Sequence, residues 1–249
     1  MTMISYAQNL EDVVLERVFK HQATGFYIDV GAWDPDRESV TKHFYSKGWT
    51  GINIEPTSYY YQRLLASRPR DINLQVAVGR RTGRKASFLE FEGTGLSALA
   101  DTANRAALQA AGYAARTVAV DVLPLSEVTD RYAPGQIDIL SIDVEGAERS
   151  VIESAEWYAF RPRVIVVEAI APLTNEPAWF AWEGLLLEAG YCFALFDGIN
   201  RFYYRAEEPE LRHALCVPAN ALDDYCPKRF LEVQEILSER AERGRRHVA

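Results

Sequence analysis

Apolar residues recur along the chain in two alternating patterns, short continuous runs and longer amphipathic stretches, and these patterns predict the secondary structure. A helix is predicted over residues 7–20, because its apolar residues fall on one stripe and Ser5 with Gln8 matches a capping box. Further helices are predicted over residues 39–47, 59–66, 148–155 and 178–189. The apolar runs between them predict buried strands over residues 25–31, 51–55, 73–78, 137–143 and 164–168.

Residues 80–120 interrupt this alternation and predict a less regular segment. Its predicted elements are strands at 86–91 and 117–122, a glycine-containing loop at 93–97 and an alanine-rich helix at 98–111. Near the C-terminus, two short strands flank an Asp197-Gly198 turn and predict an antiparallel hairpin over residues 191–204. The whole arrangement predicts an α/β fold, with a mostly parallel sheet, helices on both faces and this C-terminal hairpin.

We expect one domain over residues 1–227, on which the N-terminal helical segment 5–20 packs. Residues 228–249 carry apolar side chains at helical spacing and end in several arginines, which predicts a C-terminal helix with a basic tail. We expect this helix to dock on the domain through its apolar stripe, which consists of Phe230, Val233, Ile236 and Leu237. A contact of this segment with a partner or a membrane is the alternative.

The composition narrows the class of protein. With 249 residues, 48% of them hydrophobic, the chain has enough apolar material for a packed core. Its 27 basic residues against 35 acidic ones give a net charge of −8, which disfavours non-specific binding to nucleic acid. No apolar run is long enough for a bilayer span and the N-terminus lacks a secretory-signal pattern, so a cytoplasmic location is expected. The three cysteines and four histidines have no zinc-ligand spacing.

Acidic residues end four of the predicted strands. In a doubly wound sheet the carboxyl ends of the strands meet at the ligand-binding edge, so these side chains are predicted to share one crevice. Crowded carboxylates are costly unless a cation offsets their charge, and this favours a cationic ligand or a metal ion. The residues concerned are Asp29, Glu55, Asp143, Glu145 and Glu168.

The loop after the first strand distinguishes between cofactors. It has a single glycine, Gly31, followed by Ala-Trp-Asp-Pro at 32–35, and so lacks the GxGxxG pattern that cradles a dinucleotide pyrophosphate. This disfavours an NAD-dependent oxidoreductase. S-adenosylmethionine (SAM) has no phosphate but carries an amine, a sulfonium and a ribose, so it fits acidic residues better. Glu55, 26 residues after Asp29, is placed to accept hydrogen bonds from both ribose hydroxyls.

Several sequence blocks resemble those of the FkbM family of SAM-dependent methyltransferases, from residues 5–12 to about Pro227. The matching blocks lie at 26–32, 48–56, 94–97, 142–148 and 167–169, and late blocks at 196–203 and 218–220 resemble a subgroup found beside glycosyltransferases. The sequence departs from the family pattern at Trp33-Asp34 and at Ser141. The resemblance implies a class I methyltransferase fold and methylation of an acceptor oxygen, often a sugar hydroxyl. The resemblance implies SAM binding at Asp29, Gly31, Ala32 and Glu55, and we expect Pro56 and Ala77 to contact the cofactor beside them. Gln8 and Asp12 are further candidates, although a local role in the N-terminal helix explains them equally.

Two mechanisms are open for removing the proton of the acceptor hydroxyl during methyl transfer. In one, Asp143 and Glu168 hold Mg²⁺, which acidifies the hydroxyl, and Glu145 assists. In the other, no metal is bound and Glu145 or Asp143 acts directly as the base. The candidate acceptor contacts are Thr94, Ser97, Trp182 and Asn200. Trp182 is equally explained by core packing of a helix, and Asn200 by the hairpin turn.

The leading hypothesis is therefore a SAM-dependent O-methyltransferase that acts on a saccharide, a glycan or a sugar nucleotide. Two alternatives stay open. One is a methyltransferase of a polyketide or other natural product, and the other is a non-catalytic module that binds SAM or a glycan. The sequence also leaves the oligomeric state open, a homo-oligomer included.

Overall fold

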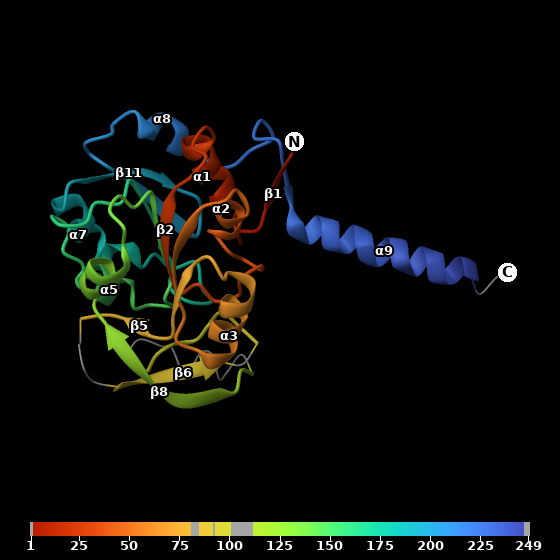
Figure 1. The fold of residues 1–249 in the computed structure, drawn as a ribbon, viewed down its shortest axis with the longest axis horizontal. Helices are drawn as coiled ribbons and strands as arrows, with labels where there is room; N and C mark the ends of the chain where they lie inside the picture. Colours follow the sequence, from red (N-terminus) through yellow and green to blue (C-terminus); the bar gives the residue numbers. More distant parts are fainter. Residues whose placement is uncertain (1, 81–84, 92, 101–111, 247–249) are drawn as a thin grey trace.

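A seven-stranded sheet forms the centre of the protein, whose computed structural model describes residues 2–80, 85–91, 93–100 and 112–246 (Figure 1). Its strands are β2 (Phe26–Val30), β3 (Thr50–Ile54), β4 (Ile72–Leu74), β9 (Ile139–Ile142), β10 (Val164–Glu168), β11 (Tyr191–Phe196) and β12 (Asn200–Arg205). They lie in the order β11-β12-β10-β9-β2-β3-β4, and the strands from β10 to β4 run parallel. β12 pairs antiparallel with β10 and with β11, so the predicted C-terminal hairpin is confirmed.

Helices cover both faces of this sheet. Neighbouring residues of a strand point to opposite sides, so the continuously apolar strands need an apolar cover on each face. On β2, Phe26 and Ile28 pack on the face covered by α5 to α7, whereas Tyr27 packs on the face covered by α1, α2 and α8. The predicted α/β fold is therefore confirmed. These helices are α1 (Glu11–Phe19), α2 (Lys42–Ser46), α5 (Leu125–Tyr132), α6 (Glu148–Ile152), α7 (Glu183–Glu188) and α8 (Leu211–Leu215).

The segment that interrupts the sequence pattern forms a second, four-stranded sheet in the order β5-β8-β6-β7, beside α3 (Figure 1). The predicted strand at 73–78 is divided, because β4 lies in the large sheet and β5 in the small one. The predicted helix at 98–111 is wrong at its start, which is strand β7, and residues 101–111 lie outside the described residues. The elements are α3 (Ser58–Ser67), β5 (Ala77–Val78), β6 (Lys85–Phe91), β7 (Ala98–Leu99) and β8 (Ala115–Leu123).

The N-terminal helix begins later than the sequence predicts. α1 starts at Glu11, and its N-cap is Leu10 in the left-handed conformation, with φ of 69° and no side-chain cap. Ser5 lies in β1 and donates its hydroxyl to Asp12 at 2.7 Å, so the predicted capping box with Gln8 is wrong. The segment before α1 is instead held by β1 (Met3–Ser5), which pairs parallel with β13 (Tyr225–Pro227).

The predicted helix at 178–189 is divided into a 3₁₀ turn, Trp179–Ala181, and α7. The break falls at Trp182, whose φ of −136° is not helical. Its indole is 2% exposed and meets the Tyr203 ring edge-on, with 6.0 Å between the ring centres. Tertiary packing of one large aromatic side chain thus overrides the helical pattern.

The C-terminal helix is confirmed as α9 (Lys228–Arg246), but its predicted docking is wrong. Figure 1 shows α9 projecting away from the body of the molecule. Its apolar stripe is exposed over about half of each side chain, 56% at Phe230, 51% at Val233, 51% at Ile236 and 58% at Leu237. Of the helices that the structure describes, none has the length and apolar character needed to cross a bilayer.

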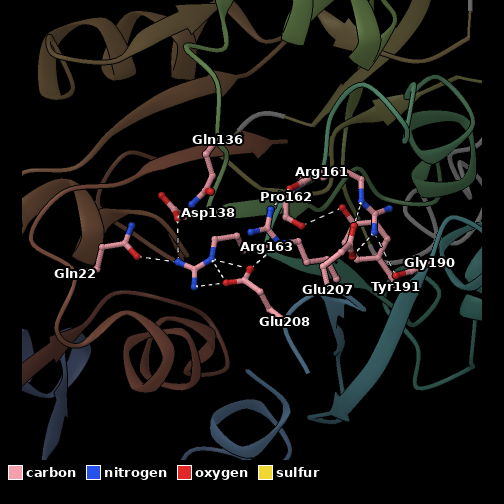
Figure 2. A network of polar contacts seen from close by, with 11 residues as sticks. Gln22, Gln136, Asp138, Arg161, Pro162, Arg163, Gly190, Tyr191, Glu207 and Glu208 are labelled. Carbon is pink, nitrogen blue, oxygen red and sulfur yellow. Dashed lines mark hydrogen bonds and ion pairs between the residues drawn. The ribbon is translucent and has the colours of Figure 1, made fainter. Parts of the chain in front are cut away.

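A polar network ties together the amino ends of β2, β9 and β10, opposite the edge where strands end (Figure 2). Asp138 accepts the backbone N–H of Phe26 at 3.0 Å. Arg163 bonds Asp138 at 3.3 Å, Gln22 at 2.9 Å and Glu208 at 2.8 Å. The network is structural, because it lies at the wrong end of a parallel sheet for ligand binding.

Arg163→Met is expected to lower the free energy of unfolding by about 2 kcal/mol while SAM affinity stays unchanged, because Asp138 and Glu208 lose their half-buried partner. Thermal and urea unfolding, with calorimetric SAM titration, measure the two effects. Arg80→Met is the matched control: Arg80 pairs with Glu153 but is 67% exposed, so its loss is expected to cost under about 1 kcal/mol. Equal losses for the two variants would contradict a special role of this network.

Candidate functional site

The loops after β2 and β9 press against each other at the carboxyl edge of the sheet. The backbone N–H groups of Gly31 and Ala32 donate to the Ile54 carbonyl at 3.0 and 3.1 Å, and the Asp143 N–H donates to Val30. A side chain at Gly31 would lie 1.7 Å from the Asp143 carbonyl oxygen, and the φ of this residue is +86°. Glycine is therefore required here by contact with the neighbouring loop as well as by backbone conformation.

Two pockets adjoin at this edge and share Gly31, Trp33, Gly95 and Asp143. The first, which we call the inner pocket, has mainly apolar walls from the ends of β2 and β3 and from the small sheet. Its lining includes Glu55, Pro56, Tyr60, Ala77, Val78, Phe88, Ser97 and Leu99. The second, which we call the acidic cavity, has a volume of about 350 Å³. Its lining includes Gln8, Glu11, Asp29, Ala32, Glu38, Thr94, Glu145, Leu173 and Asn200.

Glu55 is fixed at the rim of the inner pocket. One carboxylate oxygen accepts the Thr57 N–H at 2.7 Å and the Thr57 hydroxyl at 2.5 Å, and the other accepts the Trp33 N–H at 3.1 Å. Burial raises the pKa of Glu55 to about 7, against these hydrogen bonds, which favour the ionised form. The oxygen that accepts from Trp33 keeps acceptor capacity for a ligand hydroxyl.

Asp29 is held from behind by a buried polar chain. It accepts the Thr41 hydroxyl at 2.7 Å, and Thr41 in turn accepts an N–H of Arg68 at 3.0 Å. Burial raises the pKa of Asp29, while Thr41 and the Arg68 charge act in the opposite direction. The chain orients one oxygen of Asp29 and supports a negative charge beside the acidic cavity.

Asp143, Glu145 and Glu168 come together, each offering an oxygen within 4.8 Å of the others. Partial desolvation raises the pKa of Asp143 to about 6, although this residue is exposed at the pocket mouth, and burial with repulsion from Asp143 raises the pKa of Glu145 to about 9. The pKa of Glu168 is raised well above its usual value for the same reasons. Glu145 and Glu168 each keep one buried oxygen without a hydrogen-bond partner among the described residues. Glu145 and Glu168 therefore have unused acceptor capacity for a cation beside Asp143.

The lining of the acidic cavity is also conformationally unusual. Among the described residues, six non-glycine residues have positive φ, and four of them line this cavity. Such backbone conformations cost of order 1–3 kcal/mol each and cluster at functional sites. The four residues are Trp33, Glu38, Glu145 and Leu173.

The structure brings most predicted cofactor residues to the two pockets, with one exception. Asp12 does not line either pocket: it accepts the Ser5 hydroxyl and the Tyr6 N–H, both at 2.7 Å. Its neighbour Glu11, which sequence reasoning missed, does line the acidic cavity. Burial raises the pKa of Glu11 to about 8, and its carboxylate accepts the Asn200 amide at 2.6 Å. Glu11 and Asp12 are neighbours in the sequence, and which of the two side chains faces the cavity depends on where α1 begins. The sequence pattern placed that start too early, so it did not identify Glu11.

The predicted acceptor contacts have different surroundings: Asn200 faces the acidic cavity, Thr94 and Ser97 hold their own loop, and Trp182 lies in the core. Asn200 lines the acidic cavity, as does Thr94, but the Thr94 hydroxyl donates to the Phe91 carbonyl at 2.9 Å. Ser97 accepts the Phe91 N–H at 3.0 Å, so both hydroxyls brace their own loop. Trp182 lies in the hydrophobic core and lines neither pocket, so the prediction of an acceptor contact there is wrong.

A doubly wound sheet with an acidic carboxyl edge and no phosphate-binding glycine loop is the arrangement of a class I SAM-dependent methyltransferase. The family model of the methyltransferase FkbM domain matches residues 29–193, and the chain belongs to this family. No curated protein matches the chain with significant sequence similarity.

Solved structures with a similar chain course include two methyltransferases. A TehB-like SAM-dependent methyltransferase from Corynebacterium glutamicum has a TM-score of 0.43 and 8% identity, over 78% of this chain and 87% of that one. An O-methyltransferase from Bacillus cereus in complex with SAH has a TM-score of 0.40 and 12% identity, over 81% of this chain and 82% of that one.

Proposed function

We propose that this methyltransferase transfers a methyl group to a hydroxyl oxygen of a saccharide, a glycan or a sugar nucleotide. The observation that carries the proposal is the position of Asp143, Glu145 and Glu168. Asp143 lines both the inner pocket and the acidic cavity, so a group that can take a hydroxyl proton would stand between the proposed cofactor and the proposed acceptor. A neutral hydroxyl is a poor nucleophile unless its proton leaves during attack.

The inner pocket and the neighbouring carboxylates fit SAM. Its apolar walls suit an adenine ring, and Glu55 at the rim has free acceptor capacity for a ribose hydroxyl. Asp29, held by Thr41, would accept the ligand's amine. When bound, SAM supplies the methyl group on a cationic sulfur, whose charge complements the acidic edge.

The three carboxyls fit Mg²⁺ as well, because crowded carboxylate oxygens without partners are the ligands that this ion prefers. In this version Asp143 and Glu168 would hold the ion and Glu145 would assist. When bound, the ion lowers the pKa of the acceptor hydroxyl. In the metal-free alternative, Asp143 is the base, since Glu145 and Glu168 hold their protons more tightly.

The lining of the acidic cavity and of the groove next to it supports a polar, ring-shaped acceptor. Gln8, Glu11 and Asn200 offer amide and carboxyl groups for hydroxyl recognition in the acidic cavity. An adjoining open groove of about 780 Å³ runs between α3 and the small sheet and exposes 62% of Tyr59. An aromatic face beside hydrogen-bonding groups is a favourable surface for sugar rings, which have apolar faces and polar edges.

Excess chelator is expected to reduce turnover at least about 100-fold, and Mg²⁺ to restore it, if the carboxyls hold a metal ion. The measurement is methyl transfer to a panel of nucleotide sugars, oligosaccharides and non-sugar hydroxyl compounds. Full activity in chelator supports Asp143 as a direct base. Turnover only with non-sugar compounds would contradict the saccharide proposal. SAM binding without turnover on any acceptor would support a binding module.

SAM affinity is expected to fall as the pH drops below about 7, by up to tenfold per pH unit. The sign follows from Glu55: burial raises its pKa to about 7, so the ligand-free carboxyl is protonated below that pH and loses acceptor capacity and charge. Calorimetric titration between pH 5.5 and 8.5 measures the effect. The Glu55→Gln variant is the control, because its SAM affinity lacks this ionisation. An identical pH profile in both proteins would contradict the assignment.

A further inference from the structure

α9 presents an apolar stripe that nothing in the described part of the chain covers. The helix has 19 residues, which at 1.5 Å per residue makes it about 28 Å long. Phe230, Val233 and Leu237 follow each other at intervals of three and four residues, with Ile236 beside them, so they share one side of the helix. Each is exposed over at least half of its side chain, and together they leave a continuous apolar strip in solvent.

The charged residues of α9 are distributed unevenly around this stripe. At 100° per residue, the exposed Arg229 and Arg240 lie about 50–75° from the centre of the line formed by Phe230, Val233 and Leu237, both on the same flank. Glu232 and Glu235 lie about 130–170° away, on the opposite side, where Lys228 also lies and pairs with Glu232 at 3.7 Å. The apolar line is therefore flanked on one side by two arginines, whereas Glu232 and Glu235 face away from it.

We propose that α9 docks on a bilayer surface that contains anionic lipids, with its apolar stripe facing the acyl chains and its arginines at the headgroups. Apolar residues on one side, basic residues along the border and acidic residues opposite are the pattern of an interfacial helix. A second α9 is a poorer partner, because the bordering arginines of two such helices would repel each other. The helix is too polar to span the membrane and lies along its surface.

The net charge of the chain is compatible with this orientation. Residues 228–246 contain six basic and four acidic residues, which gives this segment a net charge of +2. Because the whole chain has a net charge of −8, the remaining residues together carry −10. Repulsion between that acidic body and anionic lipids is screened over about 8–10 Å. A projecting helix about 28 Å long places most of its length beyond this distance. Because α9 is positively charged and the rest of the chain is negatively charged, α9 is the part of the molecule that would contact an anionic membrane.

Docking through α9 would also hold the acceptor entrance near the bilayer, an extension that rests on the proposed function. Lys228, Arg229 and Glu232 line a pocket together with Gln8 and Glu38. The last two residues also line the acidic cavity. The entrance of the acidic cavity would then lie close to the lipid surface but outside it, where an acceptor that extends from the membrane would reach it.

Flotation of the full chain with vesicles tests the proposal without relying on activity. The probes are phosphatidylcholine vesicles with and without roughly 30% phosphatidylglycerol, and binding is expected only to the anionic ones and to weaken in high salt. Leu237→Glu is expected to weaken binding at least about tenfold, and Arg229→Gln with Arg240→Gln about 25-fold, or about fivefold per arginine. Glu235→Gln, on the opposite side of α9, is the matched control and is expected to bind within about threefold of the parent chain.

Each other outcome overturns the proposal. Equal binding to neutral and anionic vesicles, or unchanged binding of Leu237→Glu, removes the role of the stripe and its charges. A dimer in light scattering that Leu237→Glu dissociates would show that a second copy covers the stripe. Circular dichroism and SAM titration of each variant confirm the fold, and vesicle binding fails or succeeds independently of methyl transfer.

Discussion

Asp143→Asn is expected to lower kcat for methyl transfer at least about 1,000-fold while SAM affinity changes less than about tenfold. In both mechanisms Asp143 is the central group: it would either hold the metal ion with Glu168 or take the proton itself. Asparagine keeps the size of the side chain but has neither the charge nor the basicity. Its backbone N–H bond to Val30 is unaffected, so the contact between the loops after β2 and β9 is kept.

The measurement is single-turnover methyl transfer alongside calorimetric SAM titration. Asp130→Asn, an exposed carboxylate on α5, is the control and is expected to keep full activity. Glu168→Gln separates the two mechanisms further. If Mg²⁺ is required, this variant is expected to raise the metal concentration needed for half-maximal activity. Methyl transfer by Asp143→Asn within tenfold of the parent rate would refute the proposed site.

The large sheet could be predicted from the sequence because its strands are continuous apolar runs buried on both faces. β10 has the predicted bounds, 164–168, and the acidic residues that end neighbouring strands meet because parallel strands end on one edge. These signals are local in the sequence, or follow from topology once the strands are recognised. The fold and the position of the three clustered carboxyls therefore came from the same pattern.

The features that the sequence did not reveal depend on contacts between distant segments. Asn200 fixes Glu11 from 189 positions away, and β1 pairs with β13 across almost the whole chain. Trp182 divides a helix because it packs on Tyr203, which no periodicity shows. Conversely, α9 has the pattern of a docked helix but has no surface of its own domain to cover. Periodicity predicts which side of a helix is apolar and says nothing about what covers it.

Glu55→Gln is expected to weaken SAM binding about 100-fold, or about 3 kcal/mol. A hydrogen bond from a ribose hydroxyl to the buried Glu55 oxygen that faces Trp33 is worth about 1.5–3 kcal/mol, because the acceptor is charged. Glutamine has the same shape, but its amide nitrogen cannot accept, and it would face either the Thr57 donors or the Trp33 N–H. The variant therefore loses acceptor capacity at the point where the ligand binds.

Because the glutamine amide would face a hydrogen-bond donor, the Glu55→Gln variant also has to be tested for a loss of structure. Thermal unfolding of the ligand-free variant reports any loss of structure, and Glu188→Gln on the exposed side of α7 controls for the loss of charge alone. Titration with adenosine and with methionine separates the two halves of the ligand. The Glu55→Gln variant is expected to lose adenosine binding and to keep methionine binding, because Asp29 and the acidic cavity are unchanged. Equal loss of both, or SAM affinity within threefold of the parent, would place the ribose elsewhere.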